Sequence, residues 1–105
     1  MNHPYQVNLT AAATTDLQQI YTYISKQLLE QEAAKRLLLR LKEAASSLSI
    51  MPQRHALVID NYLAKRGVHK LLVDRYLIFY TIQEKEHTVT ILRILYAKRN
   101  WQSIV

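Results

Sequence analysis

The chain has 105 residues, enough for one small domain, and 14 Lys and Arg against 8 Asp and Glu give it a net charge of +6. It contains no cysteine, which excludes disulfides, a thiolate nucleophile and a cysteine zinc site. Residues 51–105 hold nine basic and four acidic side chains, or +5, so this half predicts a polyanionic partner such as a nucleic acid or an acidic protein segment.

The N-terminal residues predict a strand followed by a helix. Residues 4–10 alternate apolar and polar side chains, which is typical of a half-buried strand. Thr14 or Thr15 is expected to cap a helix, because Asp16 would then lie in its first turn, near the positive end of the helix dipole. Apolar side chains recur at helical spacing from there to Leu28.

A second helix is predicted after a short break. Polar residues at 29–31 interrupt the first pattern, and a new periodic run extends from Ala34 to Leu48. Pro52 restricts Met51 to non-helical geometry and therefore ends this helix. Two helices with a short joint predict an antiparallel hairpin.

The stretch 53–67 has the weakest pattern in the chain. Residues 56–59 are compatible with a short strand or with a helical turn. Gly67 is the only glycine, and its position just before a strand indicates a positive φ or a close backbone approach.

Three strands are predicted next, at 68–73, 76–82 and 89–96. Residues 74–75 make a tight connection between the first two, and the polar residues 84–87 turn the chain into the third. The strand at 76–82 is apolar on both faces, so we expect it at the centre of the sheet.

The element order β-α-α-β-β-β predicts a single α+β domain spanning residues 1–105. It consists of an N-terminal strand, a helical hairpin on one face of a mostly antiparallel, twisted sheet of three to four strands, and a short C-terminal helix at 101–105. The hairpin covers one face only. We therefore expect the other face, apart from the C-terminal helix, to be open to a partner.

Several kinds of chemistry are excluded or disfavoured. One glycine cannot form a glycine-rich phosphate loop, and the four histidines lack metal-ligand spacing, so no cofactor and no metal are expected. No apolar run approaches the roughly 20 residues of a membrane span. The N-terminus lacks the basic and apolar regions of a signal peptide. We therefore expect a cytoplasmic protein without membrane contact.

Basic and aromatic residues of the second half remain as functional candidates. Guanidinium and ammonium groups bind phosphates, and aromatic rings stack on bases. Trp101 has a second interpretation, as an anchor of the C-terminal segment on the core. The candidate target-binding or nucleic-acid-binding residues are Arg66, Lys70, Arg93, Lys98, Arg99 and Trp101.

Arg93 interrupts an otherwise apolar strand. A buried arginine must be paired or must face a cleft. The structural interpretation is a salt bridge within the sheet, to Asp60 or Asp74, and the functional interpretation is a ligand-binding group. The sequence leaves both open.

The segment from His69 to Trp101, HKLLVDRYLIFYTIQEKEHTVTILRILYAKRNW, resembles the sheet of the RelE/ParE toxin superfamily, the toxins of type II toxin–antitoxin modules. The shared pattern is a Lys-Leu strand, a Tyr-centred strand ending in Tyr, and a strand ending in a basic pair. The N-terminal half is similar to the helical hairpin of the ParE branch in its Ala-rich start, Asp16-Leu17, Ile20, Tyr23-Ile24, Ala33-Ala34 and Leu37. The resemblance covers nearly the whole chain.

The superfamily implies two alternative activities. ParE-like members poison DNA gyrase without established catalysis of their own. RelE-like members cleave mRNA on the ribosome, with basic residues against the strained phosphate and a Tyr or His for proton transfer. Nucleases commonly carry arginines where this chain has Leu77 and His69, and a C-terminal His-Tyr pair is absent here. These departures favour a gyrase poison.

The first alternative is a RelE-like mRNA interferase, in which Lys70, Arg75, Tyr96 and Arg99 would be the catalytic residues. The second alternative is an inactive member that only binds antitoxin. The resemblance implies a cognate antitoxin whose acidic, partly disordered segment folds over the toxin in a hetero-oligomer, and DNA gyrase or the ribosome with its mRNA as the target. It also implies that the chain alone arrests growth.

Overall fold

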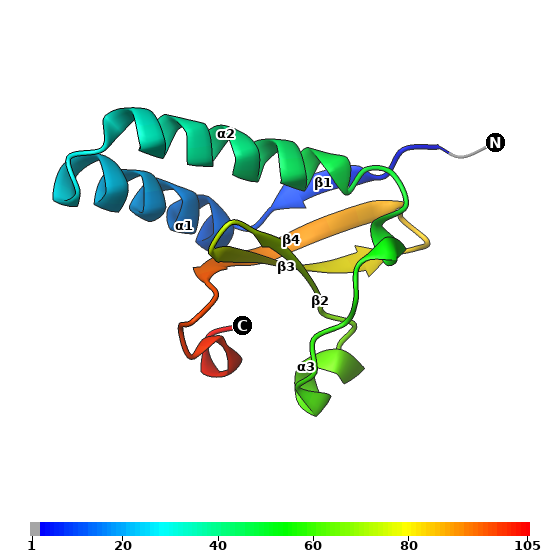
Figure 1. Cartoon of the computed structure of the whole chain (residues 1–105). Helices are drawn as coiled ribbons and strands as arrows, with labels where there is room; N and C mark the ends of the chain where they lie inside the picture. Colours follow the sequence, from blue (N-terminus) through cyan, green and yellow to red (C-terminus); the bar gives the residue numbers. More distant parts are fainter. Residues whose placement is uncertain (1–2) are drawn as a thin grey trace.

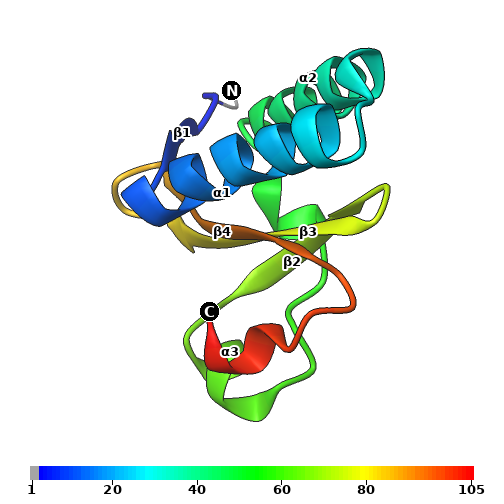
Figure 2. The ribbon, with the colours of Figure 1, turned by 90° about the vertical axis from the view of Figure 1, so that its left-hand side faces the viewer.

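The computed structural model describes residues 3–105 as a four-stranded sheet with a helical hairpin on one face and a thinner layer on the other (Figures 1 and 2). The predicted α+β class and element order are confirmed. The elements are β1 (Gln6–Leu9), α1 (Ala11–Thr22), α2 (Gln31–Ser47), α3 (Asn61–Lys65), β2 (His69–Val73), β3 (Tyr76–Gln83) and β4 (Thr88–Tyr96).

The sheet has the strand order β1-β4-β3-β2. The strands β2, β3 and β4 pair antiparallel, while β1 pairs parallel with β4, from which the helical hairpin, β2 and β3 separate it along the chain. The register slips between Phe79, opposite Arg93, and Tyr80, opposite Ile91. Leu92 is therefore the extra residue of a β-bulge in β4.

The hairpin layer contains the larger hydrophobic core. Leu37 and Leu41 of α2 pack with Ile78 and Tyr80 of β3 and with Ile91 of β4. Residues of β3 alternate between the two faces of the sheet, as their apolar pattern predicted. The central position of β3, between β2 and β4, follows from that two-sided burial.

The start of α1 differs from the prediction. The helix begins at Ala11, and Thr10 is its cap, with its hydroxyl accepting the amide N–H of Ala13 at 3.0 Å. Alanine has the highest helix propensity, so residues 11–13 join the helix. The helix therefore begins directly after Thr10, the first residue after β1, which has a side chain able to cap it. Asp16 consequently lies beyond the first turn, and it is buried.

The joint of the hairpin is a π-helical turn, Tyr23–Gln27, at the end of α1. The hydroxyl of Ser25 donates to the carbonyl of Tyr21 at 2.7 Å within this widened turn. Leu29 then reverses the chain with a φ of 53°, a left-handed conformation that costs a leucine energy. The break predicted near this residue is confirmed, and the backbone of Leu29 carries the strain.

The face opposite the hairpin is covered, contrary to the prediction. A second hydrophobic cluster is built there around Phe79 and Leu77 of β3, Leu63 of α3 and Leu95 of β4. The ring of Trp101 packs on Phe79, with centroids 5.1 Å apart. In Figure 2, α3 and the C-terminal segment lie below the sheet and the hairpin lies above it. This face is covered by short segments without hydrophobic periodicity, so the sequence contains no amphipathic pattern that predicts the cover.

Connections between elements follow the predictions more closely. Gly67 has a φ of +75°, as expected, and Asp74 adopts a φ of 54° in the tight β2–β3 turn. Residues 56–59 contribute only one bridge, between Leu57 and His69. The expected C-terminal helix is a three-residue 3₁₀ turn, Trp101–Ser103. Within residues 3–105, no helix is long and apolar enough to span a membrane.

Candidate functional site

The helical hairpin extends past the end of the sheet (Figure 1). An open groove of about 1120 Å³ lies beneath this overhang. One wall is formed by α1, its π-helical turn and α2, and the other by the β2–β3 turn and the end of β4. Its apolar lining, which we call the floor of the overhang groove, consists of Ile20, Ile24, Leu28, Ala33, Leu37, Ile94 and Leu95.

Three tyrosines line the overhang groove. Tyr76 and Tyr96, opposite one another on β3 and β4, meet edge to face with their ring centroids 5.8 Å apart. Tyr23, from the hairpin wall, leaves 54 % of its surface exposed. Burial, and then the neighbouring Tyr23 and Tyr96, raise the pKa of Tyr76. The Tyr76 phenol is therefore protonated at neutral pH, and it offers a hydrogen-bond donor beside an apolar floor.

Arginines form the rim of the overhang groove. The Nε of Arg40, from α2, donates to Oδ2 of Asp74 at 2.9 Å and so links the hairpin to the β2–β3 turn. Arg75 follows in that turn, and its carbonyl accepts the N–H of Ala97 at 2.8 Å. Arg99 lies next to the end of β4, where its N–H donates to the carbonyl of Tyr96 at 3.0 Å.

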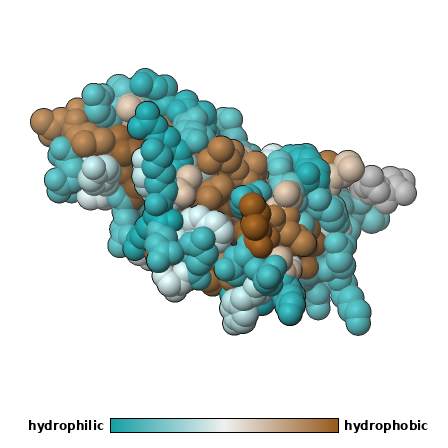
Figure 3. Space-filling model, turned by 60° about the horizontal axis from the view of Figure 1, so that its bottom comes forward, coloured by the Kyte–Doolittle hydropathy of each residue, from teal (hydrophilic) through white to brown (hydrophobic). Residues whose placement is uncertain are grey.

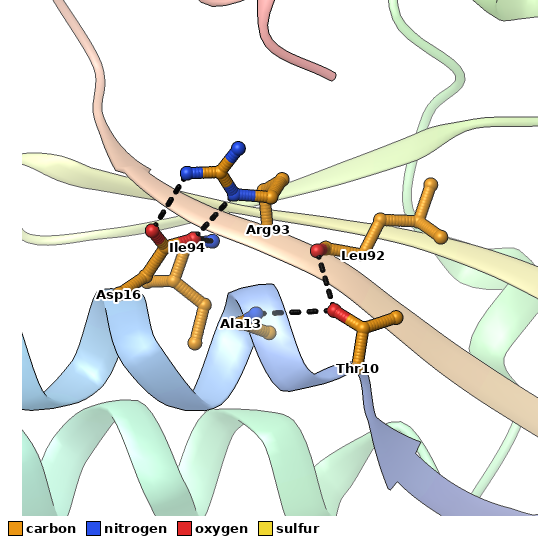
Figure 4. A network of polar contacts seen from close by, with 6 residues as sticks. All are labelled: Thr10, Ala13, Asp16, Leu92, Arg93 and Ile94. Atoms are coloured by element: carbon orange, nitrogen blue, oxygen red, sulfur yellow. Dashed lines mark hydrogen bonds and ion pairs between the residues drawn. The ribbon is translucent and has the colours of Figure 1, made fainter.

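A buried ion pair fixes the inner end of the groove wall (Figure 4). Nε and Nη2 of Arg93 donate to the two carboxylate oxygens of Asp16 at 2.7 and 2.8 Å. Oδ2 of Asp16 also accepts the backbone N–H of Ile94 at 2.9 Å. The hydrogen bonds to Asp16 raise the pKa of Arg93. Arg93 is therefore paired, as the structural interpretation expected, but its partner lies in α1 and not within the sheet. The two predicted partners are engaged elsewhere, because Asp60 caps α3 and Asp74 binds Arg40.

Figure 3 shows apolar side chains gathered at the overhanging end of the hairpin and across the middle of the lower face, surrounded by polar ones. The part of the chain that the structure describes contains no group of three or more side chains able to hold a metal ion. The overhang groove can therefore bind through apolar contact, phenol donors and guanidinium charge.

A family model described as the ParE toxin of the type II toxin–antitoxin system parDE matches residues 7–101. This match spans both the helical hairpin and the whole sheet. The chain belongs to the ParE toxin family. No curated protein matches it in sequence.

Solved structures share the fold of this ParE-family toxin. A chain of the chromosomal ParDE toxin–antitoxin system of Pseudomonas aeruginosa superposes with a TM-score of 0.75 at 20 % identity, covering 92 % of this chain and all of that one. The RelBE2 toxin–antitoxin complex of Mycobacterium tuberculosis gives 0.69 at 25 % identity, with 93 % and 98 % coverage. The archaeal RelE–RelB complex of Pyrococcus horikoshii OT3 gives 0.65 at 15 %, with 91 % and 98 % coverage.

The toxin brings some predicted site residues together and separates others. Arg75, Tyr96 and Arg99 line the overhang groove. Lys70 does not, because it stands opposite Phe79, whose side chain belongs to the core on the other face of the sheet.

The remaining candidates lie away from the groove lining. Arg66 caps α3, where its guanidinium lies 5.7 Å from the ring centre of Tyr62, and Trp101 packs on the second core. Lys98 is exposed and is not among the residues that line the groove.

Sequence reasoning missed two residues of the toxin's groove. Arg40 was not among the predicted site residues, yet it reaches Asp74 across 34 positions of the chain. Tyr23 was named only for the family resemblance, and the available signal was an aromatic residue that lies off the apolar stripe of its helix.

Proposed function

We propose that this toxin arrests growth by poisoning DNA gyrase and is neutralised by a cognate antitoxin. The match of the ParE toxin model to residues 7–101 carries the proposal, since the resemblance to ParE-like proteins implies gyrase as the target. The high TM-score to a ParDE chain supports the same branch at the level of fold.

The positions at which nucleases commonly carry arginine support this choice. Leu77 is buried in the second core, so its side chain offers no charge to a phosphate. His69 donates from Nδ1 to the carbonyl of His55 at 2.7 Å and stacks on Tyr80 with centroids 5.1 Å apart. Both side chains are therefore engaged in packing the protein.

The antitoxin is proposed from the solved relatives, which come from toxin–antitoxin systems and complexes. The overhang groove suits a segment that carries apolar and acidic side chains, because its floor is apolar and Arg75 and Arg99 lie at its rim. The net charge of +6 favours an acidic partner as well.

Ribosome-dependent mRNA cleavage is the second candidate, and one observation favours it. Arg75, Tyr96 and Arg99 come together in the overhang groove, where two guanidinium groups and a phenol are available to a phosphate. Lys70, the fourth predicted catalytic residue, is separated from them by the sheet.

The decisive experiment incubates the purified toxin with gyrase, supercoiled plasmid and ATP, and in parallel with translating ribosomes. Cleaved plasmid or a loss of supercoiling activity is expected, together with intact mRNA. Truncated mRNA with unaffected gyrase would replace the proposal by the second candidate.

Expression in cells provides an independent test of toxicity. Cells that produce this chain alone are expected to stop growing, and co-expression of the neighbouring antitoxin gene should restore growth. Normal growth with soluble, folded protein would overturn both candidate activities and leave an inactive member that only binds antitoxin.

A further inference from the structure

Residues 48–60, which we call the connector, join α2 to α3, and residues 56–58 pair with the outer edge at the start of β2. Two backbone hydrogen bonds attach the connector to that edge. The N–H of Val58 donates to the carbonyl of Val68 at 2.9 Å, and the N–H of Lys70 donates to the carbonyl of Ala56 at 3.1 Å. Where the connector lies, the edge of β2 is paired and protected.

Two side chains of the sheet hold the connector from below. The hydroxyl of the fully buried Tyr80 donates to the carbonyl of Pro52 at 2.7 Å. Nδ1 of His69 contacts the carbonyl of His55 at 2.7 Å. Because a carbonyl can only accept, Nδ1 of His69 carries a proton in this contact.

Arg54 holds the connector from the side of α2. Its guanidinium donates to the hydroxyl of Ser47 at 3.2 Å and to the carbonyl of Ile50 at 3.3 Å, at the end of that helix. Its Nε donates to Nε2 of His55 at 3.2 Å. Arginine has no acceptor, so this bond exists only while Nε2 of His55 is unprotonated.

The groups that face the His55 ring disfavour a positive charge there. Arg54 approaches it from the connector, His69 from β2, and the ring of Tyr80 from β3, at 6.5 Å and edge to face. Within residues 3–105, no hydrogen bond or ion pair joins the ring to a carboxylate. Burial, and then the charges of Arg54 and His69, lower the pKa of His55.

We propose that Arg54, His55 and His69 form a pH-sensitive clasp, which holds the connector on the edge of β2 at neutral pH and releases it in mild acid. A proton taken from solvent by Nε2 of His55 removes the acceptor of Arg54 and places a cation beside that guanidinium. The contact then becomes repulsive, and the backbone bonds of Val58 and Lys70 lose their support. The edge of β2 opens.

The direction of the pH dependence follows from linkage. The closed clasp binds fewer protons than the open one, because closure lowers the pKa of His55. The contribution to closure is complete above the ordinary histidine pKa of about 6.5 and is lost as the pH falls through the window below it. One proton is involved, so closure weakens by at most about tenfold per pH unit.

Amide hydrogen exchange measured by NMR between about pH 8 and 5 tests the clasp. After correction for intrinsic exchange, the amides of Val58 and Lys70 should lose protection in acid, while the amides paired between β3 and β4 keep theirs. His55→Gln is the matched control, because its amide oxygen can replace the Nε2 acceptor but takes up no proton. This variant should keep both connector amides protected across the range.

A second variant and a direct titration complete the test. His69→Asn retains a donor for the carbonyl of His55 but removes a charge, so the loss of protection should move to higher pH. The ring resonances of His55 in the unmodified protein report its pKa, which should lie below the ordinary value. A normal or raised pKa, unchanged protection in acid, or an equal loss in His55→Gln would each overturn the clasp.

Discussion

Arg93 and Asp16 lie 77 positions apart in sequence and form a two-point ion pair at the edge of β4, where β1 has already ended. The carboxylate of Asp16 also accepts the backbone N–H of Ile94, as a neighbouring strand would. Earlier in β4, the carbonyl of Leu92 accepts the hydroxyl of Thr10 at 2.8 Å (Figure 4). Side chains of α1 and its cap thus complete the hydrogen bonding of an edge that lacks a strand.

The first prediction concerns this pair. Asp16→Ala should lower the free energy of unfolding by about 3 kcal/mol, because it leaves the largely buried Arg93 without its partner. Denaturation in urea measures the change. Glu32→Gln is the control, since its pair with Lys35 is exposed and should contribute about 0–1 kcal/mol. The double variant Asp16→Leu with Arg93→Met should be more stable than Asp16→Ala, and failure of that recovery would contradict the ion-pair explanation.

The second prediction concerns alkaline stability. Burial raises the pKa of Tyr80 from its ordinary value of 10.0 to about 12. Since the unfolded phenol ionises first, Tyr80 has its full stabilising effect below about pH 10 and loses it as the pH rises to about 12. The loss is about 2–3 kcal/mol. Ultraviolet absorbance of tyrosinate, followed with denaturant stability, measures it. Tyr80→Phe should remove this part of the alkaline transition, and an unchanged transition would assign it to other tyrosines.

The third prediction concerns Leu29 at the tip of the hairpin. Its φ is 53° and 84 % of its surface is exposed, so Leu29→Gly should relieve backbone strain and lose little packing. We expect a gain of about 1 kcal/mol in the free energy of unfolding. Leu29→Ala is the control, because it removes the side chain but keeps the strain, and it should be close to neutral. A destabilised glycine variant would show that the leucine packs in solution.

The fourth prediction concerns the rim of the overhang groove. Arg75→Gln combined with Arg99→Gln should weaken toxicity and antitoxin binding at least tenfold while leaving thermal unfolding unchanged, because both side chains are exposed. Growth assays and titration calorimetry measure the two effects.

Lys98→Gln provides the matched control for that rim. It removes one charge from an exposed residue outside the groove lining, so any joint effect of neutralising Lys98 and Arg99 should come from Arg99. Equal losses in the Lys98 and Arg99 single variants would mean that overall charge, and not the groove, is responsible.

The sequence predicted the strands well, because β1 alternates apolar and polar side chains and β3 is a short run that is apolar on both faces. It missed the second covered face, since α3 has only five residues and the C-terminal segment is irregular, and neither produces a periodic pattern. The sequence also could not predict that Asp16 is the partner of Arg93. Pairing across elements depends on how α1 crosses β4, and no local spacing encodes that crossing.

For the groove, the sequence identified Arg75, Tyr96 and Arg99 by residue type and position after a strand. It did not identify Arg40 or Tyr23, because their contribution depends on the overhang of the hairpin past the sheet. Lys70 was grouped with the other three, but it lies on the other face of the sheet. Nearness along the chain gave no information on which face of β2 carries its side chain.

The parallel pairing of β1 with β4 joins Gln6 to Thr88 and Leu9 to Ile91. During synthesis, β1 leaves the ribosome long before its partner is made, and the sheet cannot be completed until residues 88–91 have emerged. The hairpin can form earlier, but its apolar face then lacks most of the sheet that later buries it. A protein of this topology reaches its finished shape only at the end of translation, so incomplete chains should lack the groove.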